Sequence, residues 1–285
     1  MRKEKTALIT GIGHCHMEGL GSLGDIALEK RDIFKFFTEN SIGVINGDQA
    51  VLASVGYAHP IIKFGSKTTN QIQARKVKIE SDHISFVLKI YKEKHNVRLM
   101  HAHAGAVFNA LGATVLAHYL GVPSATILKG IQEPLSVKSR FEHKELSFGR
   151  GVMISDCYNA NPESMKAALL AFEQLSTSAQ KIAVLGDMLE LGVNSPFWHR
   201  QLGRFLRKVP SLQQVILVGK MVEWTKKTMP LGLSMQHAAS WEDAVQLLQG
   251  KLDNDSVVLV KASNGMKLGN LVEHFTTTKQ QKTAE

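Results

Sequence analysis

The chain has 285 residues, of which 44% are hydrophobic and 21% are charged, a composition that excludes a disordered or collagen-like chain. Its length favours two domains over one. No apolar run approaches the roughly 20 residues of a membrane span, so we expect no membrane partner. Two cysteines, Cys15 and Cys157, are too few for a disulfide framework, and we expect a cytoplasmic protein in a reducing compartment.

The 34 basic and 25 acidic residues give a formal net charge of +9. Such a charge suits nucleic acid, a membrane surface or an anionic small substrate. The basic residues are scattered, however, and no aromatic residues are interleaved with them as in a base-stacking surface. Their densest stretch, residues 63–94, alternates charged with apolar residues, which is typical of solvated strand faces. We therefore expect a phosphate-bearing small molecule as the ligand, and no nucleic acid.

The first half of the chain predicts short strands followed by two helices. Turn residues separate the β-like runs, as in adjacent antiparallel strands, and the runs are residues 42–45, 61–64, 77–79, 84–91 and 96–100. Val107, Leu111, Val115 and Leu116 then recur on one helical face. A shorter helix is expected to follow, with Ser124 as its cap.

The second half of the chain alternates strands with helices. The strands are expected at residues 151–156, 181–186, 215–219 and 257–261, with helices beginning near residues 161, 196, 221 and 240. Asn161 and Ser240 are predicted helix caps, the latter paired with Asp243. The first of these helices is predicted to bury Met165, Ala168, Leu169, Phe172 and Leu175.

Alternating strands and helices predict an α/β fold with a doubly wound, mostly parallel sheet. A loop at about residues 131–145 marks the expected junction between the two halves. We therefore place a first domain at residues 1–140 and a second, Rossmann-like domain at residues 141–285.

Ligands of doubly wound sheets bind beyond the carboxyl ends of the strands. Three polar segments follow predicted strands there, namely Asp156–Pro162, Gly186–Gly192 and Lys261–Met266. Together they place acids, amides, a hydroxyl and a lysine on one edge. The alternative is that Asn159 and Asn161 are only turn and cap residues and that Asp187 is another cap, and it stays open for each segment taken alone.

The segment Thr10–Ser22 is a second concentration of polar groups. It does not contain the G-x-G-x-x-G pattern, and His14, His16 and Glu18 lack zinc-finger spacing. A lone histidine is more often structural than a metal ligand. The whole sequence also contains no G-x-x-x-x-G-K-[ST] phosphate loop.

Several motifs together resemble the Mur ligase family of peptidoglycan synthesis, and within it the MurF type. Leu8–Leu23 resembles the family's I-T-N-I-G-x-A-H-L-E-G-F-G-S, and Val44–Asp48 resembles V-I-N-A-D-D. Most specific is Asp156–Met165, which is similar to D-S-Y-N-A-N-P-x-S-M. The motifs follow the family order along nearly the whole chain, and the remaining ones are Glu29–Phe34, Gly186–Gly192 and Val260–Met266.

The resemblance implies an ATP-dependent amide-bond ligase that adds D-alanyl-D-alanine to UDP-N-acetylmuramoyl-tripeptide. In the family, the peptide carboxylate is phosphorylated by ATP, and the dipeptide amine then attacks the acyl phosphate. Such chemistry requires that phosphate charge be neutralised and the reactants be held in line. A folylpolyglutamate synthase, a related amide ligase, is disfavoured by the run Tyr158–Pro162.

By the same resemblance, His16 binds Mg²⁺ and Lys30 is the lysine that the family carbamylates. A carbamate turns a cation into an anionic oxygen ligand for Mg²⁺, although without the resemblance Lys30 is simply a surface lysine on a helix. The implied nucleotide-binding residues are Asn109 at the adenine, Arg140 at a phosphate, Asp156 at the ribose, and Tyr158 and Asn159 beside them.

The implied residues on the dipeptide side lie in the second half of the chain. They are Asn161, Asp187, Glu190, Lys261 and Ser263. Lys261 is expected either to hold the dipeptide carboxylate or to cap the end of its strand.

The sequence departs from the family pattern at several polar positions. Gly11, Gly105, Ala106, Ser155 and Asn264 replace family residues that carry other side chains. The family's UDP-substrate domain and phosphate loop are also not in the sequence. We therefore expect no turnover by these residues alone, and a separate N-terminal half carrying the loop as a partner. The rival hypothesis is a non-catalytic binding protein derived from a Mur ligase. We also expect exposed sheet edges and poor solubility.

Overall fold

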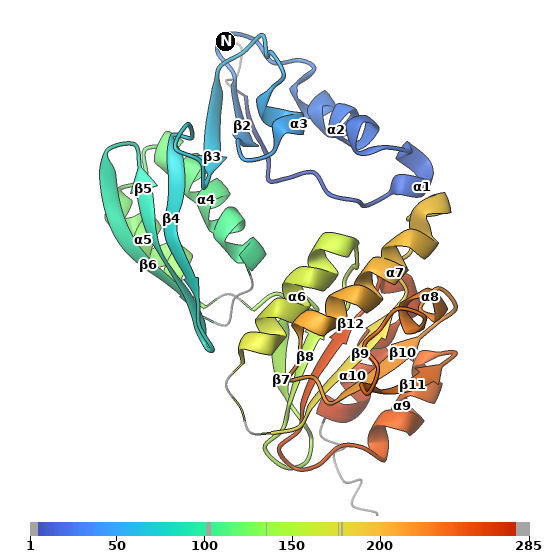
Figure 1. The fold of residues 1–285 in the computed structure, drawn as a ribbon. Coiled ribbons are helices and arrows are strands. Elements are labelled where there is room, and N and C mark those ends of the chain that lie inside the picture. Colours follow the sequence, from blue (N-terminus) through green and yellow to red (C-terminus); the bar gives the residue numbers. More distant parts are fainter. Residues whose placement is uncertain (1–4, 101–103, 135, 176, 178, 278–285) are drawn as a thin grey trace, which may run out of the picture. The chain divides into compact units, whose positions relative to one another are not determined.

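A computed structural model describes residues 5–100, 104–134, 136–175, 177 and 179–277. The chain divides into two compact units, Met1–Leu135 and Ser136–Glu285, and each contains one six-stranded sheet (Figure 1). Both sheets are rich in parallel strands and carry helices, so the predicted α/β class is confirmed. Among the described residues, no helix combines the length and the apolar character needed to cross a membrane.

The first sheet has its strands in chain order. They are β1 (Thr6–Ile9), β2 (Ile42–Asn46), β3 (Ile61–Gly65), β4 (Ile72–Ile79), β5 (His83–Ile90) and β6 (Glu93–Met100). Strands β4, β5 and β6 are antiparallel, as predicted. The prediction is wrong for β2 and β3, which are parallel to each other. Their connection contains the short helix α3 (Ala50–Ala53), and a connection of a dozen or more residues allows the crossover that parallel strands need.

Helices lie on both faces of the first sheet. They are α1 (Met17–Leu20), α2 (Leu23–Arg31), η1 (Asp32–Phe34), α3, α4 (Ala104–Tyr119) and α5 (Ser124–Gln132). The predicted apolar face of α4 is confirmed, because Val107, Leu111 and Val115 are buried against sheet residues such as Phe64. A separate cluster joins Ile26 of α2 to the strands.

The predicted cap of α5 is corrected by the structure. Pro123 occupies the cap position, and Ser124 is the first helical residue. The hydroxyl of Ser124 instead donates a hydrogen bond to Glu93 Oε2, at 2.9 Å. Proline's fixed φ allows it to start a helix without a side-chain cap.

The second sheet has the order β11-β10-β9-β12-β8-β7. Its strands are β7 (Glu142–Glu145), β8 (Val152–Asp156), β9 (Lys181–Gly186), β10 (Gln214–Val218), β11 (Ser234–Ala238) and β12 (Val257–Lys261). All neighbours are parallel except β7, which is antiparallel to β8. The sequence reading missed β7, which lies in the predicted junction loop, and β11. Both are edge strands of largely polar residues, and edge strands need no continuous apolar run.

The helices of the second unit include four that begin within two residues of their predicted starts. They are α6 (Pro162–Gln174), η2 (Gly192–Asn194), α7 (Ser195–Phe205), η3 (Leu206–Lys208), α8 (Glu223–Lys226), α9 (Trp241–Gln249), η4 (Asn264–Met266) and α10 (Leu268–Thr276). The caps at Asn161 and Ser240 are confirmed, each with a reciprocal capping box. Leu175 lies beyond α6 and is only half-buried, so its prediction as a core residue is wrong.

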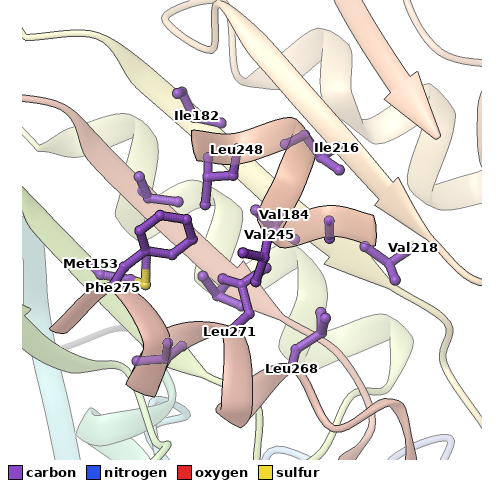
Figure 2. Close-up of a cluster of buried hydrophobic side chains, with 14 of the residues drawn as sticks. Met153, Ile182, Val184, Ile216, Val218, Val245, Leu248, Leu268, Leu271 and Phe275 are labelled. Atoms are coloured by element: carbon purple, nitrogen blue, oxygen red, sulfur yellow. The ribbon is translucent and has the colours of Figure 1, made fainter. Parts of the chain in front are cut away.

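Helices α9 and α10 cover one face of the second sheet, and α6 and α7 lie over the other (Figure 1). Figure 2 shows how residues of α9 and α10 pack on strand residues. The labelled residues are Val245, Leu248, Leu268, Leu271 and Phe275 from the helices and Met153, Ile182, Val184, Ile216 and Val218 from the strands. This core fixes the strands whose carboxyl ends carry the candidate site.

Candidate functional site

The candidate site lies at the carboxyl edge of the second sheet. The chain passes from β8 over α6 to β9, continues outward to β10 and β11, and returns as β12 between β9 and β8. The strand order therefore reverses in the middle of the sheet, where open α/β sheets bind ligands. Loops after β8, β9, β10 and β12 meet at this edge.

A buried ion pair joins the ends of β8 and β12. Lys261 Nζ lies 2.7 Å from Asp156 Oδ2, and it also donates hydrogen bonds to the carbonyl oxygens of Asn159 at 3.1 Å and Asp156 at 3.4 Å. Lys261 is 1% exposed. Burial lowers the pKa of its ammonium group, and the charge of Asp156 works in the opposite direction. All three ammonium donors have acceptors inside the protein.

A strained turn aims Arg140 at the same edge. Ser139 and Phe141, on either side of Arg140, both have left-handed φ values, 58° and 55°, and such strain persists only where surrounding contacts hold it. Tyr158 N donates to Ser139 O at 3.1 Å, and Phe141 N donates to Asp156 Oδ1 at 3.3 Å. The Arg140 guanidinium consequently stacks 4.1 Å from the centre of the Tyr158 ring.

Ser263 lies in the loop after β12 and forms hydrogen bonds to the loops after β8 and β9. Its hydroxyl accepts a hydrogen bond from Leu189 N at 2.9 Å and donates to Ala160 O at 3.4 Å. Its own N–H donates to Asp187 O at 3.2 Å. The loops after β8, β9 and β12 therefore form one hydrogen-bonded layer.

Asp187 extends this layer to β10. Its carboxylate accepts hydrogen bonds from Lys220 N at 3.0 Å and Val222 N at 2.8 Å. Gly219 makes this approach possible, because a side chain there would meet Asp187 Oδ2 at 2.5 Å. Asp187 thus caps the turn after β10.

The two asparagines make local hydrogen bonds. Asn161 Oδ1 accepts from Ser164 N at 2.8 Å, as the cap of α6, and Asn159 Oδ1 accepts from Ala160 N at 2.8 Å. Glu190 is exposed and has a left-handed φ of 61°. Their geometry is that of turn and cap residues, and their roles toward a substrate stay predictions.

A pocket of about 620 Å³ opens beside Tyr158. Its lining residues are Lys138, Ser139, Cys157, Tyr158, Asn264, Lys267, Gly269 and Asn270. Two ammonium groups and two amides make it suitable for an anionic ligand with hydrogen-bonding groups. The Cys157 thiol is no nucleophile here, because burial raises its pKa to about 11 and only the thiolate is reactive.

Three predicted site residues belong to the first unit. His16 precedes α1 with a left-handed φ of 57°, Lys30 is exposed in the last turn of α2, and Asn109 is exposed on α4. No three His, Cys, Asp or Glu side chains come together as metal ligands in the part of the chain that the structure describes. Mg²⁺ is commonly held by one or two carboxylates, water and substrate phosphates, so His16 with a carbamylated Lys30 remains a prediction.

Two family models match the chain and together cover most of it. The Mur ligase middle domain matches residues 2–117, and the Mur ligase glutamate ligase domain matches residues 139–264. The chain belongs to the Mur ligase family. The two models coincide with the two compact units in order and in approximate extent.

This Mur ligase chain is similar to known MurF proteins. It is 30% identical over 270 residues to a UDP-N-acetylmuramoyl-tripeptide–D-alanyl-D-alanine ligase of Bacillus subtilis, covering 94% of this chain and 58% of the relative. A crystal structure of MurF from Acinetobacter baumannii matches with a TM-score of 0.80 and 25% identity, covering 94% of this chain and 59% of that one. MurF of Thermotoga maritima in complex with ADP has a TM-score of 0.79 at 24% identity, covering 96% of this chain and 62% of that one. The chain thus spans about three-fifths of these relatives.

The structure of the Mur ligase chain groups most of the predicted residues of the second unit. Arg140, Asp156, Tyr158, Asn159 and Lys261 are joined by direct contacts, and Ser263 links them to Asp187. His16, Lys30 and Asn109 lie in the other unit.

The sequence reading missed His199 of α7. It is fully buried, and its Nε2 accepts from Met188 N at 3.1 Å while Nδ1 lies 2.8 Å from Ser195 O. We assign the proton to Nδ1, since Nε2 faces a donor. Burial lowers the pKa of His199, so the neutral ring supports the loop that follows Asp187. Nothing in the sequence around position 199 indicates this role.

The pocket residues Lys138, Lys267 and Asn270 were also missed. Lys267 directly follows the motif Val260–Met266 and could have been found as its extension. Lys138 lies in the predicted junction loop, and only the fold brings it to the pocket.

Proposed function

We propose that this Mur ligase chain takes part in the MurF reaction, adding D-alanyl-D-alanine to UDP-N-acetylmuramoyl-tripeptide at the expense of ATP. The observation that carries the proposal is the arrangement of Arg140 on Tyr158 beside a cationic pocket, at the strand-order reversal of the second unit. The Bacillus subtilis relative bears the name of this reaction.

In the proposed reaction, the substrate carboxylate attacks the terminal phosphorus of ATP, and ADP leaves. The dipeptide amine then attacks the acyl carbon, and phosphate leaves. The planar fork of Arg140 holds permanent charge toward a phosphate, and the exposed Tyr158 ring offers a stacking surface. The Asp156–Lys261 pair keeps the loop under Tyr158 in place.

The proposal includes Mg²⁺ and Lys30. A carbamate on Lys30, with His16, would hold the ion, which when bound neutralises phosphate charge. Lys30 is exposed, and no hydrogen bond or ion pair occupies its amine among the residues described. CO₂ therefore has access to this amine.

The phosphate cradle is a further part of the proposal. The sequence contains no G-x-x-x-x-G-K-[ST] loop, and this loop is the usual backbone cradle for nucleotide phosphates. We infer that a separate segment carrying such a loop completes the site.

The test is an amide-ligation assay with ATP, Mg²⁺, UDP-N-acetylmuramoyl-tripeptide and D-alanyl-D-alanine. It is run with and without an added loop-bearing segment from a MurF relative. We expect phosphate release coupled to product, and Lys30→Ala should lower the rate roughly 100-fold, as the loss of a charge-stabilising group commonly does. Lys35→Ala, at another exposed lysine of the same unit, is the matched control.

A second candidate is a non-catalytic binding protein. Gly105, Ala106 and Asn264 stand where the family carries histidine, asparagine and arginine, and each replacement would weaken a polar contact that the resemblance implies. This candidate predicts that the chain binds nucleotide without turnover under every assay condition. It also predicts that Lys30→Ala leaves nucleotide affinity unchanged.

A further inference from the structure

The outer face of β4, β5 and β6 carries a cluster of basic residues away from the site described above. The inner face of these strands packs on α4 through residues such as Leu88 and Val97. The outer face bears a cavity of about 440 Å³, lined by Thr68, Gln73, Arg75, Lys76, Val87, Lys89 and Lys94. We call this cavity the basic pocket.

The strand register brings the cations of the basic pocket together. Lys89 of β5 is directly opposite Lys94 of β6, and Gln73 of β4 is opposite Lys89 on its other side. Arg75 lies two residues along β4, on the same face as Gln73. Side chains directly opposite each other in antiparallel strands are close neighbours, and like charges in such positions destabilise the sheet.

A bulge adds a fourth cation to the pocket. The register of β4 shifts between Arg75 and Lys78, and Lys76 has a left-handed φ of 53°. Bulges re-aim side chains, and here the consecutive residues Arg75 and Lys76 both line the cavity. A non-glycine residue in this conformation is strained, so the sheet bears strain as well as repulsion here.

Carboxylates compensate cations elsewhere on this sheet but not in the basic pocket. Arg98 Nη2 lies 3.2 Å from Asp82 Oδ2, and His95 Nε2 lies 3.1 Å from Glu93 Oε2. Across the described ranges of the chain, the four cations of the pocket have no ion pair with an acid. Within the described residues, Arg75 Nη1 donates a hydrogen bond to Ser66 O at 3.4 Å.

A polar loop borders the pocket. Gln73 Nε2 donates to Thr68 O at 3.1 Å and to Asn70 O at 2.6 Å, and this fixes the loop between β3 and β4 against the sheet. The Thr68 side chain then lies at the wall of the cavity, where its hydroxyl can donate a hydrogen bond to a bound anion.

We propose that the basic pocket binds a small anion of the diphosphate class, with two linked phosphate groups. The four cations form two pairs, Lys89 with Lys94 and Arg75 with Lys76. Two pairs of cations match two linked phosphates better than one phosphate. The volume of the cavity lies in the range of about 300–1,000 Å³ of small-molecule sites. Among the described residues, no aromatic side chain lines the pocket, which disfavours a single-stranded nucleic acid that would stack its bases. The site is independent of the proposed ligase function.

The test is calorimetric titration of the full chain with inorganic pyrophosphate at low ionic strength, where screening is weak. We expect binding by the wild type, weaker binding of orthophosphate, and an affinity at least tenfold lower in the double variant Lys89→Gln/Lys94→Gln. That variant should fold, because it removes a repulsive pair. The matched control Lys35→Gln/Lys129→Gln removes two exposed lysines from the same unit and should bind as the wild type does.

The pocket beside Tyr158 in the second unit also carries cations and could bind pyrophosphate in the same titration. A variant Lys138→Gln/Lys267→Gln removes two cations there and should leave the affinity of the basic pocket intact. The proposal is overturned if pyrophosphate does not bind, or if this variant, rather than Lys89→Gln/Lys94→Gln, abolishes binding. It is also overturned if duplex DNA binds more tightly than pyrophosphate and loses affinity in Lys89→Gln/Lys94→Gln, since that marks a general polyanion surface.

Discussion

The carboxyl edge of the second sheet and the outer face of β4–β6 in the first sheet differ in whether their lysines are paired with acids. At the edge, the ammonium of Lys261 is buried and its donors are satisfied by Asp156 and by backbone carbonyls. On the outer face, Lys89 and Lys94 lie opposite each other, and neither forms an ion pair with an acid among the described residues. The buried charge of Lys261 supports the fold, whereas the cations on the outer face, which have no ion pair among the described residues, are available to a ligand.

The largest expected effect comes from breaking the buried pair. Lys261→Met leaves Asp156 buried without its counter-charge, which should lower the free energy of unfolding by about 3–5 kcal/mol. Urea unfolding followed by tryptophan fluorescence measures this, because the three tryptophans lie in the second unit.

Two further variants separate charge from packing at this position. Asp156→Asn/Lys261→Met removes both charges and should be more stable than Lys261→Met alone. Lys267→Met changes an exposed lysine and should shift the unfolding free energy by no more than about 0.5 kcal/mol. A Lys261→Met variant as stable as the wild type would show that the pair is not structural.

Buried histidines make both units sensitive to acid. Burial lowers the pKa of His59 below its ordinary value near 6.5, and His59 Nε2 has no partner within the described structure. The unfolded chain therefore binds the proton first as the pH falls. Stability of the first unit should be complete above about pH 7 and should fall by at most about 1.4 kcal/mol per pH unit below the ordinary pKa.

His59→Phe should flatten this pH dependence in the first unit alone. His199 keeps the same dependence in the second unit, because burial also lowers its pKa. Hydrogen exchange followed by mass spectrometry reads the two units separately. An unchanged slope in the first unit of His59→Phe would assign the acid sensitivity to another group.

Arg140 is an exposed cation of the edge, and its substitution should change ligand affinity rather than stability. Arg140→Lys loses the planar fork and its stack on Tyr158, so ATP affinity should fall about tenfold, or about 1.4 kcal/mol. Calorimetric titration with ATP measures the change. Arg150→Lys, at an exposed arginine paired with Asp255, is the control, and equal affinities in the two variants would remove Arg140 from the nucleotide site.

The smallest expected effect is a gain in the stability of the first unit. Lys89→Gln relieves its repulsion with Lys94 and should raise the free energy of unfolding of the first unit by about 0.2–1 kcal/mol. The gain should shrink in high salt, where surface charges are screened. Lys92→Gln removes an exposed lysine of the β5–β6 turn and should give no comparable gain. A loss of stability in Lys89→Gln would mean that Lys89 supports the sheet.

Local sequence patterns predicted those parts of the fold that depend on neighbours in the chain. The spacing of Val107, Leu111 and Val115 predicted α4, and Asn161 followed by proline predicted the start of α6. Both signals act within a few residues. The polar edge strand β11 was missed, because edge pairing leaves little hydrophobic pattern to detect.

The candidate site was predictable only in part. The strand-end rule predicted Tyr158 and Asp187 as residues of one edge, and the resemblance implied Arg140 only as a phosphate-binding residue. They did not identify Lys138 or His199, because the contacts of these residues come from remote parts of the chain. Nor did the motifs show that Asp156 and Lys261 neutralise each other.

The sequence by itself determined the α/β class, the alternation of the central strands and helices of the second unit, and the membership in the Mur ligase family, because these depend on periodicity, caps and motifs along the chain. Only the tertiary structure decided which charges are paired and which remain available. Lys261 and Lys89 are both lysines in or at the end of a strand, and no local pattern distinguishes them. Strand register and burial distinguish them, since one ammonium lies against Asp156 in the interior and the other lies against Lys94 at the surface.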